Sequence, residues 1–560
     1  MNAGTLVRLD KAEPDVPKEE VARGVRWSCG IVLVATLVLV LAMLRRTHGH
    51  FTYLLDDPAI HLAVARDLAL HGTWGVSPHD YQSASSSPLW TLLLAPFALL
   101  PRPVFEVVPL ILNVAAALWI ARLLVVRTGL LRPAWGRWLD VAAMFVVLVG
   151  VLFLPGLAAV GMEHTLHIAF LLQALVWLQD WLDGVDGRAW RRAVLMLGLA
   201  AATRFETPFV AAGIGVGLLL LCVPRLRPSP RPRLLRQTQR AVVLGLVSLI
   251  PLACYAVVNL AMGQDALPNS VVAKSALGGG TSGIRITLVG TVEALAKDPV
   301  VLVGFVLALT YCLAAFYGGP RRYLVLATTL VVTALLHSAL ASYGWYERYQ
   351  AYLVAIVVLF VLLAARECVP VRFIKAAPAV IAVAGALLVP VKWDLLRQAP
   401  LAADNTYLQR YQAALFVERY YKGLPIATGE VGYIALYHDG PLLDVLGLAS
   451  HEVLSARRDH RATAAFWADI VKRAGARLIV VYPLSIFFDT PAQWILVGEL
   501  TLHEKTLSAF EPALQFWAPA VGDVARIHAQ LLAFRARLPP GATIDINKDI
   551  NKDVSRHTAG

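Results

Sequence analysis

The chain has 560 residues, of which 58% are hydrophobic and only 16% are charged, and its mean hydropathy is +0.62. Soluble globular proteins average about 45–50% apolar and about 25% charged residues, so this composition excludes a water-soluble protein and predicts several membrane spans. The net charge of +12 lies largely in short basic loops between apolar runs. That distribution is typical of a membrane protein facing anionic lipid and does not indicate a nucleic-acid partner.

The apolar runs predict a cytoplasmic tail over 1–26 and a membrane module over 27–390. A helix needs about 20 mostly apolar residues to cross the hydrocarbon of a bilayer. We expect about eleven transmembrane helices, over 27–44, 104–126, 138–154, 164–182, 190–203, 208–223, 241–262, 299–317, 323–340, 350–364 and 374–390. Because Arg45 and Arg46 follow the first run in place of a small-residue cleavage site, we interpret 27–44 as a retained span rather than a signal peptide.

The basic residues predict the orientation of these spans. Two or more Arg or Lys residues occur in each of the loops 127–137, 183–192, 224–240, 318–322 and 366–375. The positive-inside rule places these loops in the cytoplasm, so that 45–103 form the first external loop and the chain from 391 onward lies outside. One ambiguity remains in a short apolar run at 88–100. If this run crosses the membrane, either 190–203 or 208–223 must fail to span it.

The end of the chain predicts a soluble α/β domain over 391–535. Strand-like runs such as 426–427 and 478–482 alternate there with helix-like stretches rich in Arg, Ala and Glu. A length of about 140 residues is ordinary for one domain. The tail 536–560 contains a near-repeat of Asp, Ile, Asn and Lys, and we expect it to be disordered.

Two adjacent carboxylates, Asp56 and Asp57, lie just outside the first span. They precede a predicted short interfacial helix over 59–70, with Pro58 in its first turn. Such carboxylates could act as a general base or bind a divalent cation such as Mg²⁺, Mn²⁺ or Ca²⁺. Asp57 could instead simply cap the helix, but a cap needs one aspartate and the sequence has two. We therefore expect Asp56 or Asp57 to be catalytic, with His61 contacting the substrate.

Further polar groups gather at the outer ends of the predicted spans, where ionisable side chains usually line a cavity or pair with one another. We expect substrate contacts from Tyr81, Glu163, His164, Glu206, Asn269, Tyr346 and Glu347. A structural role is an equal alternative for some of them, because Arg204 could simply pair with Glu206 or Glu163. The serines before Pro88 could form only a turn and a helix cap.

Arg348 stands at the outer end of the span 350–364 and opposes the positive-inside bias. A lipid phosphate in the outer leaflet would explain it, since Arg pairs with phosphate through two parallel hydrogen bonds. Lys274 could add a second positive charge, and Arg204 is a third candidate. Carboxylates and cations around one outward-facing site suit glycosyl transfer from a lipid-linked donor. The acceptor hydroxyl needs a base, and the departing phosphate needs positive charge.

In their order along the chain, six motifs resemble the GT-C glycosyltransferases, integral membrane enzymes that use polyprenyl-phosphate sugars. They are Asp56-Asp57, Ser-Ser-Pro-Leu-Trp at 86–90, Gly161-Met162-Glu163, Thr203-Arg204-Phe205-Glu206, Pro268-Asn269-Ser270 with Lys274, and Glu347-Arg348-Tyr349. The runs 427–433 and 443–448 are similar to the soluble domain of the arabinofuranosyltransferase-like branch, which includes terminal β-arabinofuranosyltransferases. Two departures, Thr-Arg-Phe-Glu for the usual Thr-Arg-Pro-Glu and Pro-Asn-Ser for Pro-Asn-Thr, keep the Arg, the Glu and a hydroxyl.

The resemblance implies an α-helical polytopic membrane enzyme with a C-terminal soluble α/β domain, in which Asp56 or Asp57 is the catalytic carboxylate. It implies transfer of a sugar, with arabinofuranose suggested by the branch, from an outer-leaflet polyprenyl-phosphate donor to a cell-surface glycan or protein acceptor. The enzyme would lie in the bacterial inner (plasma) membrane, with its active site and C-terminal domain toward the periplasm or exterior.

A transporter or flippase for lipid-linked sugars is the alternative to an enzyme. It predicts ionisable groups near the middle of the membrane and a hydropathy repeat between the two halves of the chain. In this sequence the polar groups gather at the outer span ends, and the two halves show no such repeat. Transfer therefore remains the preferred interpretation.

Overall fold

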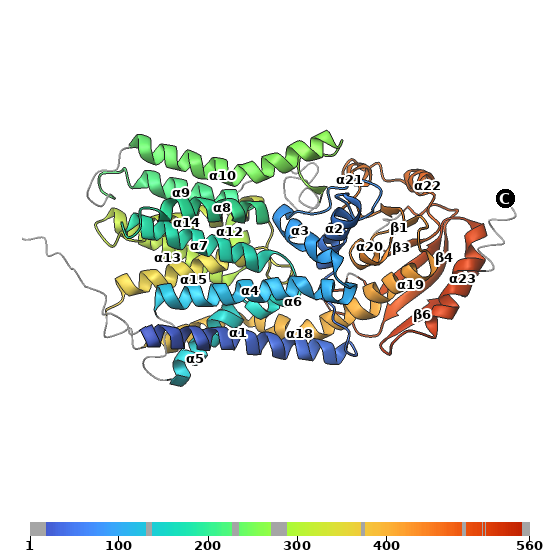
Figure 1. Cartoon of the computed structure of the whole chain (residues 1–560), viewed down its shortest axis with the longest axis horizontal. Helices are drawn as coiled ribbons and strands as arrows, with labels where there is room; N and C mark the ends of the chain where they lie inside the picture. Colours follow the sequence, from blue (N-terminus) through green and yellow to red (C-terminus); the bar gives the residue numbers. More distant parts are fainter. Residues whose placement is uncertain are drawn as a thin grey trace, which may run out of the picture.

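The computed structural model describes residues 18–129, 137–226, 234–269, 288–370, 376–483, 489–506, 508–509 and 511–550. Within these residues a bundle of helices forms one end of the molecule, and a sheet flanked by helices forms the other (Figure 1). Lys274, one of the cations expected at the site, lies outside the described residues.

Helices account for the whole membrane module, and all of the expected spans fall at least partly on them. In chain order they are α1 (Lys18–Arg46), α2 (Asp57–His71), α3 (Pro88–Leu94), η1 (Ala95–Leu99), α4 (Arg102–Thr128), α5 (Arg137–Phe145), η2 (Val146–Val151), α6 (Leu154–Val160), α7 (His164–Leu182), α8 (Ala189–Thr203), α9 (Thr207–Leu220), α10 (Leu234–Ala261), α12 (Leu288–Leu295), α13 (Pro299–Phe316), α14 (Leu324–Leu340), α15 (Ala351–Cys368) and α17 (Ala377–Leu388).

Fewer helices reach full membrane length than the sequence predicts. In the described part of the chain seven are long and apolar enough to cross: Lys18–Arg46, Arg102–Thr128, Trp138–Val160, His164–Leu182, Leu234–Ala261, Pro299–Phe316 and Ala351–Cys368. An eighth results if α17 and the helix after it, bent by 67° at their junction, count as one span. The run 88–100 forms only a short apolar helix.

The polytopic helical membrane fold is thus confirmed, and helices shorter than a full span lie where three of the other spans are expected. α9 has 14 residues, α8 has 15 and α14 has 17. At 1.5 Å per residue, α9 extends over about 21 Å, against roughly 30 Å of hydrocarbon. The ends of all three helices lie within three residues of the ends of the predicted runs.

Glycines bring the short helices α9 and α14 together. A Cβ added at Gly213 would lie 2.8 Å from the Cα of Thr329, and one added at Gly217 would lie 3.0 Å from the Cα of Val325. The four-residue spacing puts both glycines on one face of α9, which lets helices approach closely in a membrane. The two contacts run in opposite order along the two helices, so these are antiparallel. The start of α9 therefore lies beside the end of α14.

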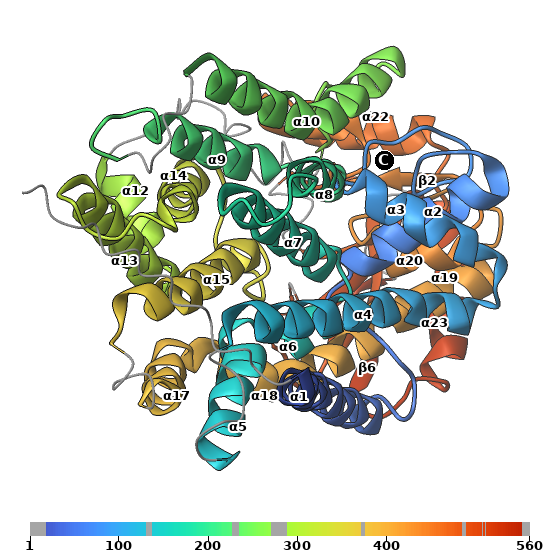
Figure 2. The same cartoon turned by 60° about the vertical axis from the view of Figure 1, so that its left-hand side comes forward.

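α10 forms one outer side of the bundle, and α5 and α17 lie on the opposite side (Figure 2). Apolar side chains of α10 such as Leu246, Ile250 and Val257 are exposed by 56, 54 and 66%. An apolar surface of this kind marks contact with a membrane rather than with water.

The C-terminal domain is α/β, as the sequence predicts, and its sheet is mixed. Among the described residues the sheet has six strands in the order β2-β1-β3-β5-β4-β6. They are β1 (Ile426–Thr428), β2 (Leu442–Asp444), β3 (Ile479–Val481), β4 (Ile495–Leu502), β5 (Ala513–Ala518) and β6 (Ala542–Ile546). β1 pairs in parallel with β2 and β3, whereas β3–β5, β4–β5 and β4–β6 are antiparallel. The flanking helices are α20 (Tyr433–Tyr437), α21 (His451–Arg458), α22 (Ala464–Arg473) and α23 (Val521–Arg535).

One helical run connects the membrane module to the sheet (Figure 1). It consists of α18 (Pro390–Asn405), the π-helical turn η3 (Thr406–Tyr411) and α19 (Gln412–Tyr420). α18 packs against α1. On α19 the ring of Phe416 contacts Phe516 and Phe534 of the sheet domain, with centroids 5.1 and 5.4 Å apart. The boundary predicted at residue 391 therefore falls inside a run that both parts share.

The predicted disordered tail over 536–560 is wrong for its first part. Residues Ala542–Ile546 form β6 and pair with β4, and Ile544 is completely buried. Ala542 and Ile544 point inward while Asp545 is exposed, which is the two-residue period of a strand. The polar repeat in the sequence conceals this alternation.

Removal of residues 537–560 should destabilise the sheet domain, because it exposes the face that β6 covers and leaves one side of β4 unpaired. Burial of Ile544 alone is worth about 1.5–3 kcal/mol, so we expect the melting midpoint to fall by several degrees. Truncation after residue 550 keeps β6 and should melt like the full chain. Identical melting of the two truncated proteins in thermal unfolding would contradict the structural role of β6.

Candidate functional site

The site forms where the loop after α1 enters α2. Pro58 occupies the first turn of this helix, as the sequence predicts. The helix is not interfacial, however, since all residues from Pro58 to Ala65 are buried. It packs between α3 and η1 on the membrane side and α20 on the sheet side (Figure 1). Apolar residues surround α2 on nearly every face, and they carry the two aspartates into the interior instead of onto the bilayer.

Asp56 joins the loop between α1 and α2 to the soluble domain. Its two carboxylate oxygens accept hydrogen bonds from the backbone N–H groups of Gly432 and Tyr433, at 2.7 and 2.9 Å. Although Asp56 precedes the first turn of α2, its side chain makes no capping bond to that helix. Burial raises the pKa of Asp56, and the charge of Arg410 and the two N–H groups oppose that rise. A Cβ at position 432 would lie 2.3 Å from the Asp56 Cγ, so this approach requires glycine.

A buried ion pair of the soluble domain lies near Asp56. Arg410 of η3 donates from Nε to Glu430 at 2.5 Å and from Nη1 to the Ser508 carbonyl at 2.7 Å. Burial raises the pKa of Glu430 to about 7, against the opposing effect of Arg410. The soluble domain thus contributes charged groups to the region directly beside the first external loop.

Asp57 faces Arg348, in the loop before α15. The Asp57 Oδ2 lies 3.2 Å from the Arg348 Nη2. Arg348 is only 1% exposed, yet its Nε and Nη1 have no hydrogen-bond partner among the described residues. Buried donors are nearly always satisfied in folded proteins. Two unsatisfied donors on one buried guanidinium therefore indicate a place for an anion.

A left-handed turn presents Arg348. Residues 344–347 (Gly-Trp-Tyr-Glu) all have positive φ, between 50° and 90°. For a residue other than glycine this conformation costs roughly 1–2 kcal/mol. Contacts around the turn must therefore hold it in place.

Gln350 provides those contacts. Its Oε1 accepts a hydrogen bond from the Gly344 N–H at 2.9 Å. Its Nε2 donates to Glu347 at 2.8 Å and to Asp298 at 3.2 Å. Asp298 in turn caps the start of α13 with its other oxygen. The turn is thus tied to a membrane helix, which fixes the position of Arg348.

Arg204 brings together three of the expected residues. Its Nη1 donates to Glu163 at 2.6 Å and to the His164 Nε2 at 2.7 Å. Its Nε donates to Glu206 at 3.1 Å. His61 of α2 approaches the same group, with its Nε2 3.8 Å from Glu163. Both pairings that the sequence leaves open as structural alternatives are therefore present.

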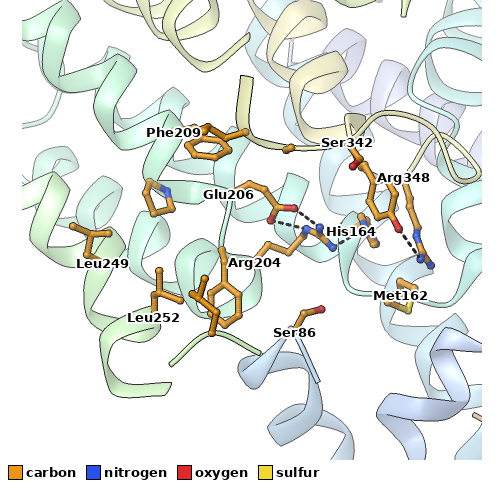
Figure 3. Close-up of a pocket in the computed structure, with 16 residues that line it drawn as sticks. Ser86, Met162, His164, Arg204, Glu206, Phe209, Leu249, Leu252, Ser342 and Arg348 are labelled. Carbon is orange, nitrogen blue, oxygen red and sulfur yellow. Dashed lines mark hydrogen bonds and ion pairs between the residues drawn. The ribbon is translucent and has the colours of Figure 1, made fainter. Parts of the chain in front are cut away.

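A cavity of about 350 Å³ opens beside these groups. It is lined by Ser86, Met162, His164, Arg204, Phe205, Glu206, Pro208, Phe209, Leu249, Leu252, Leu267, Leu340, Ala341, Ser342, Arg348 and Tyr349. Figure 3 shows Phe209, Leu249 and Leu252 on one side and His164 and Arg348 on the other. The cavity therefore has a charged end and an apolar wall.

Eight expected residues that the structure describes lie outside this lining: Asp56, Asp57, His61, Tyr81, Glu163, Asn269, Tyr346 and Glu347. Asn269 is fully buried, and neither polar atom of its side chain has a partner among the described residues. Tyr346 and Glu347 belong to the left-handed turn. Tyr81 donates its hydroxyl to the Asn259 side chain at 2.6 Å.

Sequence reasoning missed several residues of the lining. Ser86, Met162 and Tyr349 stand inside the quoted motifs, so the signal was present, although these side chains were not singled out. Leu249 and Leu252 come from the apolar span α10. Nothing in a membrane sequence distinguishes a leucine that lines a cavity from one that faces lipid.

Within the described part of the chain, the two adjacent aspartates are not joined by other ligands into a cation site. Both oxygens of Asp56 accept backbone N–H groups, and Asp57 faces a guanidinium. Among the residues that the structure describes, no group of three or more His, Cys, Asp or Glu could hold a metal ion. The arrangement therefore does not fit the divalent cation that the aspartate pair alone suggests.

Two comparisons concern the sequence. A family described as a domain of unknown function, DUF8728, matches residues 401–517, from the end of α18 to β5. No curated protein matches the chain. This family match covers most of the sheet domain and none of the membrane helices before α18.

Solved structures give a likeness over nearly the whole chain. ArnT from Cupriavidus metallidurans in the apo state has 13% identity and a TM-score of 0.50, over 89% of this chain and 98% of its own. ArnT bound to undecaprenyl phosphate gives the same identity and TM-score over 89% and 99%. The oligosaccharyltransferase AglB from Archaeoglobus fulgidus has 12% identity and a TM-score of 0.47 over 88% and 74%. The likeness to ArnT confirms the expected GT-C-like fold.

Replacement of Gly432 by Ala should weaken the docking of the soluble domain, because the added Cβ would overlap the Asp56 carboxylate. We expect a loss of about 1–3 kcal/mol in the free energy of unfolding, as for other overpacked sites. Gly522→Ala is the matched control, since a Cβ there meets nothing within 4 Å. Thermal unfolding of the two variants checks this, and equal stability would rule out the close approach.

Replacement of Gln350 by Leu should release the left-handed turn, because the N–H of Gly344 loses its acceptor and two carboxylates lose a donor. Each buried group left unsatisfied costs about 1–3 kcal/mol. Hydrogen exchange of 342–350 should accelerate. Gln398→Leu, at a half-buried position of α18, serves as the control. Unchanged exchange in both variants would show that Gln350 does not hold the turn.

Proposed function

We propose that this protein is a membrane glycosyltransferase that moves a sugar from a polyprenyl-phosphate donor to a cell-surface glycan or protein acceptor. One observation carries the proposal: a buried arginine with two unpartnered donors lies in a cavity with an apolar wall. A polyprenyl phosphate has the matching parts, an anionic head and a hydrocarbon chain. ArnT, which has the same fold, was solved with undecaprenyl phosphate bound, and this supports a ligand of that class.

Arg348 is the first choice for the donor phosphate. Its Nε and Nη1 have no partner among the described residues, and a phosphate could accept a charge-assisted hydrogen bond from either of them, while Nη2 stays near Asp57. Arg204 lines the same cavity, but it already pairs with Glu163 and Glu206. Lys274 remains a further candidate. The phosphate would thus accept hydrogen bonds from Arg348 in addition to the one that Asp57 accepts.

Asp57 would be the catalytic carboxylate. The oxygen of an acceptor hydroxyl attacks the anomeric carbon of the donor sugar, and the hydroxyl proton passes to Asp57. The bond between the anomeric carbon and the phosphate oxygen breaks, and that oxygen leaves with the bonding electrons as polyprenyl phosphate. Arg348 stabilises the negative charge on the departing phosphate. Asp56 would position Asp57, because its own oxygens already accept two backbone N–H groups.

Three buried polar residues, Glu163, His164 and Asn269, would contact the sugar. Glu163 Oε2, His164 Nδ1 and both polar side-chain atoms of Asn269 have no hydrogen-bond partner among the described residues. Sugar hydroxyls both donate and accept hydrogen bonds, so they could satisfy carboxylate, imidazole and amide groups together. His61 lies near this group through Glu163. An apolar ligand would leave these atoms unsatisfied.

The arrangement of the basic loops supports an outward-facing site. α7 begins at His164, which lines the cavity, and ends at Leu182, just before the loop 183–192. The loop 318–322 lies at that same end, where Arg322 contacts Asp183 at 3.1 Å. Because basic loops face the cytoplasm, the cavity and the soluble domain would face the periplasm or exterior of a bacterial inner membrane.

The sugar we propose is arabinofuranose, on the resemblance of two runs in the soluble domain to arabinofuranosyltransferases. The first run, 427–433, supplies the N–H groups of Gly432 and Tyr433 to Asp56. The second run, 443–448, contains Asp444, which accepts N–H groups of its own loop. The first of these runs is thus in contact with the proposed catalytic loop.

Substitution of Asp57 and Arg348 should separate chemistry from donor binding. Asp57→Asn should lower the transfer rate about 10²–10⁴-fold through loss of the base, and it should keep or strengthen binding of polyprenyl phosphate because Arg348 is released. Arg348→Gln should weaken that binding about 10–100-fold through the lost charge-assisted hydrogen bonds. Transfer assays with polyprenyl-phospho-arabinofuranose and titrations with polyprenyl phosphate measure the two effects.

The matched controls are Asp394→Asn and Arg397→Gln, which remove an exposed ion pair of α18. Both should behave like the unchanged protein, since exposed pairs contribute little. Full transfer by a folded Asp57→Asn variant would remove Asp57 from the mechanism. Undiminished polyprenyl-phosphate binding by Arg348→Gln would remove Arg348 from the donor site.

A further inference from the structure

A second cavity, of about 420 Å³, lies between the membrane module and the edge of the sheet. Its walls come from residues 80–82 between α2 and α3, Gln264 after α10, Ile426 of β1, 441–444 with 449–452 around β2 and the start of α21, and Ala474 after α22. The cavity therefore exists only where the two parts of the molecule meet.

We propose that this second cavity binds the acceptor, and that the acceptor is a hydroxyl-rich glycan without negative charge. The inference rests on the proposed function and adds the class of acceptor to it. The lining contains the carboxylates of Asp80 and Glu452 and the amides of Gln82 and Gln264. Such groups accept hydrogen bonds from sugar hydroxyls, and the amides also donate to them.

The charge of the lining separates the two cavities. Lys and Arg are missing from the lining that the described residues form around the second cavity, whereas Arg204 and Arg348 line the first. Asp80 is exposed, and Glu452 pairs with Arg473, which lies outside the lining. An anionic acceptor would meet the like charges of Asp80, Asp444 and Glu452, and His451 is the one residue of the described lining that could carry a compensating positive charge, when protonated.

Two segments connect the cavities. In one segment, Gln82 lines the second cavity and Ser86 lines the first. In the other segment, Gln264 lines the second cavity and Leu267 lines the first. An extended chain advances at most about 3.6 Å per residue, so the first pair of Cα atoms lies within about 14 Å and the second within about 11 Å. A glycan longer than one sugar could therefore lie in the second cavity with its terminal hydroxyl in the first.

Contacts across the junction hold the two walls in register. Asp265, next to Gln264, lies 3.3 Å from the His451 ring and 3.8 Å from the Arg458 guanidinium, both on α21. On the membrane side, Tyr81 donates to Asn259 of α10 at 2.6 Å. The residues on both sides of the second cavity are thus held in place by contacts to α10 and α21.

A glycan array tests the proposal with the full-length protein in lipid nanodiscs. The array carries neutral oligosaccharides and the same oligosaccharides with a terminal carboxylate. We expect the unchanged protein to bind the neutral set. Asp80→Lys should move this preference toward the carboxylated set, because it places a cation in the lining. Ala474→Trp, which fills the cavity from the end of α22, should weaken binding of the neutral set by about tenfold or more, the factor given by roughly 1.4 kcal/mol.

Asp545→Lys is the matched control, because Asp545 lies on β6 at the opposite edge of the sheet from β2. It should leave glycan binding unchanged. Absence of glycan binding by the unchanged protein, or binding that Asp80→Lys and Ala474→Trp leave unaltered, would overturn the proposal. Polyprenyl-phosphate binding in the same nanodiscs reports separately on the donor site. Its dependence on Arg348 shows whether only the acceptor assignment has failed or the proposed function as well.

Discussion

The carboxylate of Asp56, buried between a membrane loop and the sheet domain, is the contact on which the rest of the arrangement depends. Hydrogen bonds to a charged group are worth about 1.5–3 kcal/mol each, and an unpaired buried carboxylate would be destabilising. Asp56 is therefore fixed wherever Gly432 and Tyr433 are fixed. Asp57 is the next residue in the chain, so its position is fixed together with that of Asp56. The soluble domain thus takes part in building the membrane site, although it contributes no residue to the first cavity.

Arg348 and the turn before it adopt arrangements that are unfavourable in free energy. Arg348 retains two unsatisfied donors while buried, and the turn before it consists of left-handed residues. Both features cost free energy, and the hydrogen bonds of Gln350 offset part of that cost. Strain held by surrounding structure is common at binding sites, because it orients a group before the ligand arrives. The proposed donor site agrees with that pattern.

Much of the fold followed from the sequence, because lipid imposes a simple rule on backbone polar groups. Only helices satisfy these groups within one segment of an apolar run, so runs such as 104–126 and 299–317 could be assigned directly. Full membrane length was harder to predict. α9 and α14 are shorter than a full span and pair through the glycines of α9, and this pairing depends on the neighbouring helix rather than on hydropathy.

For the site, the sequence by itself determined which polar residues stand at the outer ends of spans, since hydrocarbon excludes them elsewhere. It therefore identified Asp57, Arg348 and Glu163 as candidates without their contacts. Only the tertiary structure decided that Asp57 meets Arg348, while Asp56 turns to the soluble domain. These partners lie about 290 and 370 residues apart in the chain. Local sequence carries no record of such contacts, because they arise only when separate helices and the sheet pack together.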